Sequence, residues 1–184
     1  MRKVLLFAAI ACMAASCASK KAAQEAYQGD VEIVIPCTGS EYRTDKETFR
    51  ASGMGYSSDM NIAKNKALLN ARAELATSIN STIKRVLDNY ASSYQMGEEE
   101  EAKSKFQDMA RSIVNQQLQG SVITCEKLMK TPEGKYRAYV CVELGGPEVI
   151  NKVNNSVKNE DKLRIDYEYE KFKDVFEEEM SKME

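Results

Sequence analysis

The spacing of apolar residues predicts one long helix more clearly than any other element of the chain. Between about residues 58 and 89, apolar side chains recur every three or four positions, which is the spacing of a single helix face. Ser57 or Ser58 is suited to cap this helix, with Asp59 in its first turn. Its alanines would allow a close approach to a sheet, namely Ala63, Ala67, Ala71, Ala73 and Ala76.

Four short segments have the composition of β-strands, namely residues 31–35, 48–55, 121–130 and 136–144. The last two form the strongest hairpin signal, because Pro132 and Gly134 suit the turn between them. If Thr131 pairs with Lys135, six apolar side chains share the face toward the helices, namely Val122, Leu128, Ala138, Val140, Val142 and Leu144.

Further helices complete the predicted architecture. A second helix should begin near Glu98, and the acidic run at residues 98–101 fits a solvated first turn better than a cation site. Pro147 suits the first turn of a third helix. Residues 159–184 should form an amphipathic helix that docks on its own domain. We therefore predict an α+β domain over residues 31–158, in which an antiparallel sheet of about four strands is packed by the long Ala-rich helix and the second helix, with a C-terminal helical tail.

The N-terminus has the layout of an export signal. Two basic residues precede an apolar run that is too short to span a bilayer, and small residues follow it. Residues 14–17, Ala-Ala-Ser-Cys, resemble the bacterial lipobox, which implies that residues 1–16 are removed and that Cys17 is acylated. Cys12 is a poorer acceptor, because the apolar region before it is much shorter. The alternative is an ordinary signal peptide with an unmodified Cys17.

Acylation would turn the chain into a domain on a lipid anchor, with residues 17–30 as the lipidated cysteine and a polar linker. By resemblance to proteobacterial sorting rules, the lack of Asp after Cys17 implies the outer membrane. Lys20 and Lys21 stand where surface-displayed lipoproteins often carry acidic residues, which favours a periplasm-facing domain over one on the cell surface. Because the signal carries two of the 26 basic residues, its removal changes the formal charge from −2 to −4, and no nucleic-acid partner is expected.

The composition excludes several classes of enzyme. The chain has no histidine, so Ser-His-Asp, Cys-His and His-ligated zinc sites are excluded within one subunit. It has no tryptophan to form a sugar platform, and a carboxylate hydrolase would need two acidic side chains that converge in one cleft. Residues 53–55, Gly-Met-Gly, fit a strand end better than a dinucleotide fingerprint, since Ser58 replaces the third glycine. We expect no enzymatic activity, no cofactor and no metal site.

Three cysteines remain beyond the lipidation site, namely Cys37, Cys125 and Cys141. The predicted hairpin register places Cys125 opposite Cys141, which is within disulfide reach in an oxidising periplasm. We predict a Cys125–Cys141 disulfide. The alternative is three small buried thiols.

Residues 49–55, Phe-Arg-Ala-Ser-Gly-Met-Gly, and the alanine-spaced helix that follows them resemble the Lpp-twenty-like lipoproteins. They are also similar to the N-terminal domain of the flagellar assembly protein T family. The resemblance covers roughly residues 47–145, and it implies an envelope location and a structural or assembly role without catalytic residues. Residues 31–44 resemble uncharacterised lipoproteins of the Bacteroidales.

We therefore expect a non-enzymatic, lipid-anchored envelope protein that acts through contacts with another envelope protein, and self-association is compatible with this role. The candidate contacts are aromatic residues of the tail, which could instead complete the core, namely Tyr167, Tyr169, Phe172 and Phe176. The alternative function is binding of a small molecule or glycan in a pocket between sheet and helices, lined by tyrosines such as Tyr56, Tyr90, Tyr94, Tyr136 and Tyr139.

Replacement of Cys17 by Ala should release the protein from the membrane fraction of its host, because acyl chains would be its only firm attachment. Envelope fractionation followed by immunoblotting measures this, and a pull-down from the same cells should lose a specific envelope partner. A variant that stays with the membranes would refute lipidation at this residue.

Overall fold

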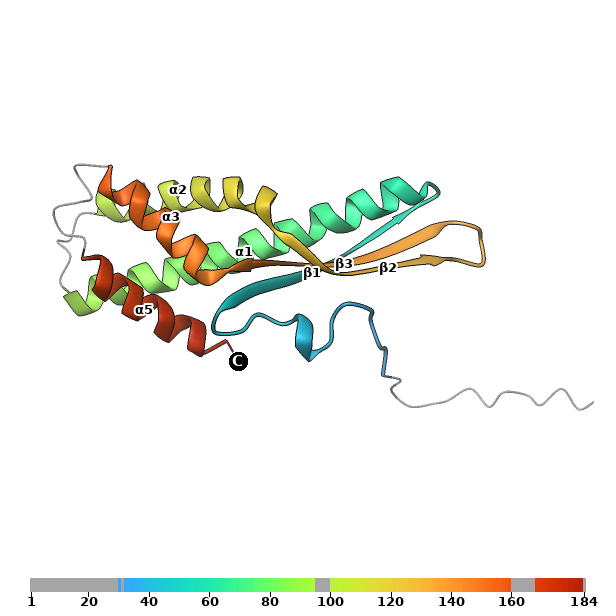
Figure 1. Cartoon of the computed structure of the whole chain (residues 1–184), viewed down its shortest axis with the longest axis horizontal. Helices are drawn as coiled ribbons and strands as arrows, with labels where there is room; N and C mark the ends of the chain where they lie inside the picture. Colours follow the sequence, from blue (N-terminus) through green and yellow to red (C-terminus); the bar gives the residue numbers. More distant parts are fainter. Residues whose placement is uncertain (1–29, 31, 95–99, 160–167, 184) are drawn as a thin grey trace, which may run out of the picture. The chain divides into compact units, whose positions relative to one another are not determined.

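The computed structural model describes residues 30, 32–94, 100–159 and 168–183 (Figure 1). The chain divides into two units, Met1–Ile33 and Val34–Glu184, and the described helices and strands all lie in the second. In chain order they are η1 (Ser40–Tyr42), β1 (Thr48–Ser57), α1 (Met60–Tyr94), α2 (Glu100–Gln117), η2 (Leu118–Gly120), β2 (Val122–Lys130), β3 (Tyr136–Gly145), α3 (Gly146–Lys158) and α5 (Tyr169–Ser181). The fold class is α+β, as predicted.

The long helix α1 begins one or two residues later than predicted. The Asp59 carboxylate accepts a hydrogen bond from the Ile62 N–H over 2.9 Å, and the Asp59 carbonyl accepts the first helical bond, from Ala63. Asp59 therefore caps the helix, and the prediction of Ser57 or Ser58 as the cap is wrong. The Ser57 hydroxyl instead accepts the N–H of Asp59.

The sheet has three strands in the order β1-β3-β2, and both pairings are antiparallel. The hairpin turn is as predicted, because the Thr131 N–H donates to the Lys135 carbonyl over 2.8 Å. Gly134 has a φ of 78°, a left-handed conformation that glycine adopts without steric cost.

The fourth predicted strand, at residues 31–35, is not formed over the described residues 32–35. Two features prevent it from joining the sheet. Cys37, with a φ of 61°, lies in a turn directly after Pro36, and the disulfide of Cys37 directs the chain across one face of the sheet. The outer edge of β1 is also occupied, since the side chain of Thr44 bonds to the backbone of Arg50.

The register of β2 shifts by one residue between Ile123 and Cys125. This bulge turns Val122 away from α1 and leaves it 58% exposed. Leu128 lies on the helix side but is 40% exposed, because α1 packs on β1 and β3 and leaves the edge strand β2 uncovered. The prediction that Val122 and Leu128 are core residues is therefore wrong. The other four predicted core positions of the hairpin are buried, namely Ala138, Val140, Val142 and Leu144.

Small residues bring α1 into unusually close contact with β1. A Cβ atom added to Gly53 would lie 2.5 Å from the Ala67 carbonyl oxygen, and one added to Gly55 would lie 2.5 Å from the Ala67 amide nitrogen. Ala63, Ala67 and Ala71 are fully buried at this contact. The two backbones therefore meet with almost no side chain between them.

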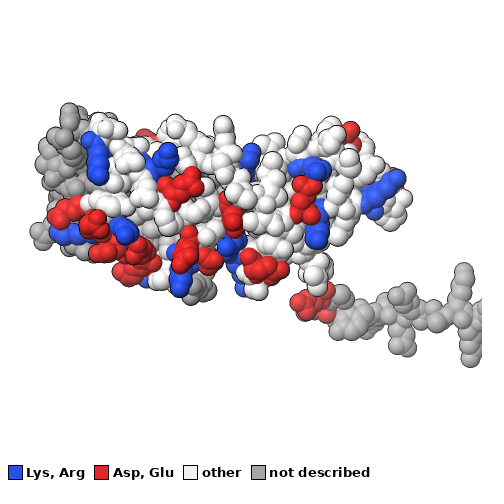
Figure 2. All heavy atoms as spheres, in the orientation of Figure 1, with Lys and Arg blue, Asp and Glu red and all other residues white. Residues whose placement is uncertain are grey.

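The helices α2, α3 and α5 pack around the part of α1 that is distant from the hairpin turn (Figure 1). Phe172 of α5 contacts Tyr90 and Phe106, with ring centroids 5.6 and 5.3 Å apart. The Glu179 carboxylate accepts hydrogen bonds from Arg85 and Asn89 of α1 over 3.2 and 2.8 Å. The C-terminal helix thus docks on its own domain, as predicted, while the acidic side chains on its outer side gather on the surface (Figure 2).

Gly53→Ala should lower the free energy of unfolding by about 2–3 kcal/mol, because the new methyl group forces α1 away from β1. Urea denaturation of the variant and the parent measures this difference. Gly120→Ala is the matched control, since no atom lies within 4 Å of its added Cβ, and it should change stability by less than about 0.5 kcal/mol. Equal effects of the two substitutions would contradict the close-packing explanation.

Candidate functional site on the open face of the sheet

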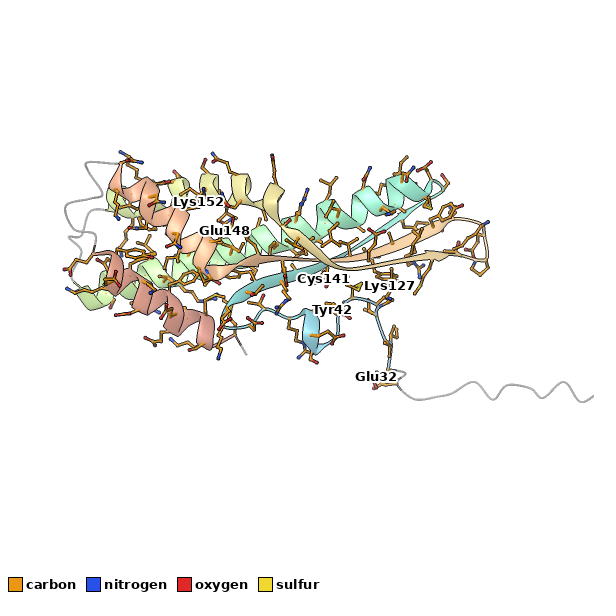
Figure 3. The ribbon with its side chains drawn as sticks, in the orientation of Figure 1. Glu32, Tyr42, Lys127, Cys141, Glu148 and Lys152 are labelled. Carbon is orange, nitrogen blue, oxygen red and sulfur yellow. A yellow bond between two sulfur atoms is a disulfide. The ribbon has the colours of Figure 1, made fainter. Side chains whose placement is uncertain are left out.

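The sheet has one face against α1 and a second, open face on which no α-helix of the described residues packs. Residues 37–45, here named the strap, run across part of this open face (Figure 3). The Ser52 hydroxyl donates a hydrogen bond to the carbonyl of Cys37, and the thiol of Cys141 lies 3.9 Å from the carbonyl of Tyr42. The strap therefore covers the middle of the open face.

The end of the strap is fixed to the edge of β1. The Thr44 hydroxyl accepts the Arg50 N–H over 3.0 Å and donates to the Arg50 carbonyl over 3.1 Å. The Arg50 guanidinium forms ion pairs with Asp45 and Glu143. Its hydrogen bond to Asp45 is the main reason that the pKa of this carboxyl lies below its ordinary value, and the N–H groups of neighbouring residues lower it further.

The structure replaces the predicted disulfide by a different one. Cys125 is bonded to Cys37 of the strap, whereas Cys141 is a free, buried thiol, so the predicted Cys125–Cys141 bridge is wrong. The predicted register itself is correct, because Cys125 does lie opposite Cys141. The prediction gave Cys37 no disulfide partner.

The hydrogen-bond pattern explains why the opposed cysteines do not bridge. Both backbone groups of Arg50 bond to Thr44 and so point away from β3. Its partner Glu143, and Cys141 two residues earlier, must therefore point their backbone groups toward β2. Cys141 and Cys125 form a hydrogen-bonded pair, in which the Cβ atoms lie farther apart than a disulfide allows.

Beyond the strap, the open face carries exposed apolar and basic side chains. We name this surface the distal sheet face and define it by Met54, Tyr56, Lys127, Met129 and Arg137. Met54, Tyr56 and Met129 are 46, 38 and 45% exposed. The cross-strand register places Tyr56 next to Arg137, and Arg137 next to Met129. Figure 3 labels Lys127 on the same side of the sheet as the strap.

Cations surround the aromatic ring at the centre of this surface. The Arg137 guanidinium lies 5.8 Å from the ring centroid of Tyr56, and the ammonium of Lys135 lies 5.4 Å from it. Both distances allow cation–π attraction. These contacts hold the Tyr56 ring in place and give the surface a positive charge.

The predicted aromatic contacts of the tail do not form a surface. Phe172 and Phe176 are only 1 and 4% exposed, so the prediction that they contact a partner is wrong, and they complete the core instead. Tyr169 is half-buried and donates a hydrogen bond to Asn151 over 2.9 Å. Tyr167 lies outside the described residues.

The five tyrosines of the predicted pocket do not come together. Tyr90 is buried and accepts a hydrogen bond from the N–H of Glu168 over 2.9 Å. Tyr136 packs on the main core, whereas Tyr139 packs beside the cysteines on the opposite face. Tyr56 is on the distal sheet face, and the side chain of Tyr94 is outside the described part. The prediction of one tyrosine-lined pocket is therefore wrong.

A solvent-open groove of about 540 Å³ lies instead between α3 and α5. The residues that line it include Asn151, Tyr169, Lys173, Phe176 and Glu177. The predicted tail residues Tyr169 and Phe176 thus line a hollow, although they do not form an exposed stripe.

Carboxyl groups with shifted pKa values do not have the properties of a general acid. A hydrogen bond from Lys182 is the main cause that lowers the pKa of Glu179, with Arg85 adding to it. Hydrogen bonds within its own turn, first from Thr131, lower the pKa of Glu133. A general acid needs a raised pKa. The described residues contain no cluster suited to a metal ion and no helix with the length and apolar character needed to cross a membrane.

Comparison with protein-family models, with curated proteins and with solved structures found no match to the chain. The resemblance to the Lpp-twenty-like lipoproteins therefore stays a prediction. The predicted lipidation site Cys17 and the acidic residues 98 and 99 lie outside the described part of the chain.

Sequence reasoning missed most of the distal sheet face. A usable signal exists in β1, where Gly53 and Gly55 alternate with Met54 and Tyr56. Once the glycines are assigned to the helix side, the period of two places the large side chains on the opposite face. In contrast, no local pattern identifies Cys37 as the partner of Cys125, since 88 residues separate them.

Alkylation without reductant, followed by digestion and mass spectrometry, should find one linked peptide pair that contains Cys37 and Cys125, with Cys141 alkylated after unfolding. Cys37→Ser should lower the free energy of unfolding by about 4.5 kcal/mol in the chain-entropy model, because the bridge closes a long loop. A peptide pair that joins Cys125 to Cys141, or three alkylated cysteines, would contradict the observed pairing.

Proposed function

We propose that the protein is a non-enzymatic, lipid-anchored protein of the bacterial envelope that binds another envelope protein through the distal sheet face. One observation carries this proposal. Among the described residues, the exposed large apolar side chains lie on residues 33–35, on β1 and β2, and on the first half of α1, and α2, α3 and α5 carry none. Such segregation is typical of an interaction surface rather than of random exposure.

The chemistry of the distal sheet face suits a protein partner. Tyr, Met and Arg are enriched at protein interfaces, and Tyr56, Met129 and Arg137 are adjacent in the register of the sheet. The long stems of Lys127 and Arg137 add apolar contact area below their charges. The expected partner surface is therefore acidic at its rim and apolar at its centre.

The strap supports the same assignment. It covers the middle of the open face and stops short of the row formed by Tyr56, Arg137 and Met129, which has no cover among the described residues. Where one face of an antiparallel sheet contacts water, every second residue of a strand points to that face, and these residues are normally polar. The presence of Met and Tyr at such positions favours contact with another molecule.

The groove between α3 and α5 favours a second candidate function, the binding of a small molecule or glycan fragment. Its volume of about 540 Å³ lies within the usual range of ligand pockets. Tyr169 offers a ring, and Asn151 and Lys173 offer polar contacts. The groove ranks second because its most apolar wall, Phe176, is almost entirely covered by protein.

A photo-crosslinking amino acid placed at Tyr56 should capture one envelope protein in the native host, whereas the same probe at the exposed Lys152 of α3 should not. Arg137→Glu in the Tyr56 probe strain should reduce the crosslink at least about tenfold, because it reverses a charge at the centre of the surface. Immunoblotting and mass spectrometry of the crosslinked band provide the readout.

Equal crosslinking from both positions, or adducts with lipid only, would contradict a protein contact at the distal sheet face. The same experiment with the probe at Tyr169 distinguishes the distal sheet face from the groove between α3 and α5. If neither probe captures a protein, and if a glycan fragment binds saturably to the parent but not to the Tyr169→Ala variant, the groove is favoured.

A further inference from the structure

The two edges of the sheet differ in how their backbone groups are satisfied. On β1, the outward groups of Arg50 bond to the Thr44 side chain. The outward carbonyl of Met54 accepts a hydrogen bond from the Asn70 side chain of α1 over 2.9 Å. Side chains thus close the β1 edge against another strand, which is how proteins commonly protect such edges.

The β2 edge has no such closure among the described residues. Because Cys125, Lys127 and Met129 direct their backbone groups toward β3, the groups of Glu126, Leu128 and Lys130 point outward. No described residue donates to or accepts from these outward groups. All residues of β2 except Cys125 are exposed. The strand is therefore a nine-residue template that can still accept a partner strand.

We propose that β2 pairs antiparallel with β2 of a second copy of this chain, on a twofold axis that passes through the Leu128 pair. The two sheets then form one continuous sheet of six strands. This inference goes beyond the proposed function, because it concerns the β2 edge and a second copy rather than the distal sheet face and a different envelope protein.

Charge and the length of the paired segment together favour this register among those that twofold symmetry allows. A residue on the axis faces its own copy, so an axis at Glu126, Lys127 or Lys130 would oppose like charges. An axis at Met129 would leave only residues 128–130 of each strand to pair. An axis at Leu128 pairs the two leucines and places Glu126 of each chain opposite Lys130 of the other. The backbone groups of all three residues point outward from the β2 edge, and their side chains lie on the helix side of the sheet. Each of these pairs can therefore form the backbone hydrogen bonds of an antiparallel ladder.

Burial supports the same axis. Leu128 is 40% exposed on the face that α1 leaves uncovered, and its counterpart in the second copy would cover it. The Glu126 carboxylate already lies 2.6 Å from Lys64 of α1, so Lys130 of the second copy would complete a three-charge group. Lys127 and Met129 lie on the other face, so pairing would bring two distal sheet faces onto one side of the continuous sheet.

Sedimentation equilibrium of the full chain carrying Cys17→Ser, which removes the acyl acceptor, tests this pairing. We expect a monomer–dimer equilibrium. Glu126→Lys or Lys130→Glu alone should weaken dimerisation about tenfold, because two symmetry-related pairs change from attraction to repulsion. The double swap Glu126→Lys with Lys130→Glu should restore the dissociation constant to within about threefold.

Glu74→Lys is the matched control, because it makes the same charge change at an exposed position of α1, and it should leave the equilibrium unchanged. Leu128→Pro should abolish the dimer, since it removes an outward N–H at the axis, while circular dichroism verifies that the monomer stays folded. A monomer at all concentrations would overturn the proposal, and so would a dimer whose dissociation constant is unchanged by the single charge reversals. Neither result depends on whether the Tyr56 probe captures an envelope protein.

Discussion

The contact between the backbones of β1 and α1 is the constraint on which the rest of the structure depends. Gly53 and Gly55 provide no side chain, and the alanines of α1 provide only methyl groups, so the helix lies directly on the strand. A helix held this close covers β1 and β3 and reaches β2 mainly through the Lys64–Glu126 ion pair, so Leu128 stays exposed on that face. The exposure of Leu128, the open edge of β2 and the thinness of this part of the domain all follow from the same contact.

The strap takes the place of a second layer on the other face of the sheet. It lacks regular structure apart from one turn of 3₁₀-helix, so it cannot satisfy its backbone through a ladder. Its hold therefore comes from discrete bonds: the disulfide to Cys125, the hydroxyl of Thr44 at Arg50, and the ion pairs of that arginine. Because these bonds are few and localised, the strap covers only the middle of the open face and leaves the row around Tyr56 uncovered.

The elements that local pattern determines could be predicted from the sequence, and those that distant contacts determine could not. The periodicity of α1 and the turn at Thr131–Lys135 are encoded within a few neighbouring residues, so both were predicted. The strand expected at residues 31–35 had the right composition, but the edge it needed is closed by Thr44 and Asn70. The partner of Cys125 depended on which opposed pairs are hydrogen-bonded, and the period of two alone does not contain that information.

The division of the domain into two regions bears on how it would act. Around α5, aromatic rings such as Phe172 are packed in a thick core of helices, and the surface is acidic. Near the hairpin, the sheet is covered by one helix on one face, so large side chains on the open face cannot be buried within the chain. A protein under selection for solubility alone would place polar residues there. Met54, Tyr56 and Met129 stand there instead, beside the cation of Arg137, which is the composition expected of the partner surface that we propose.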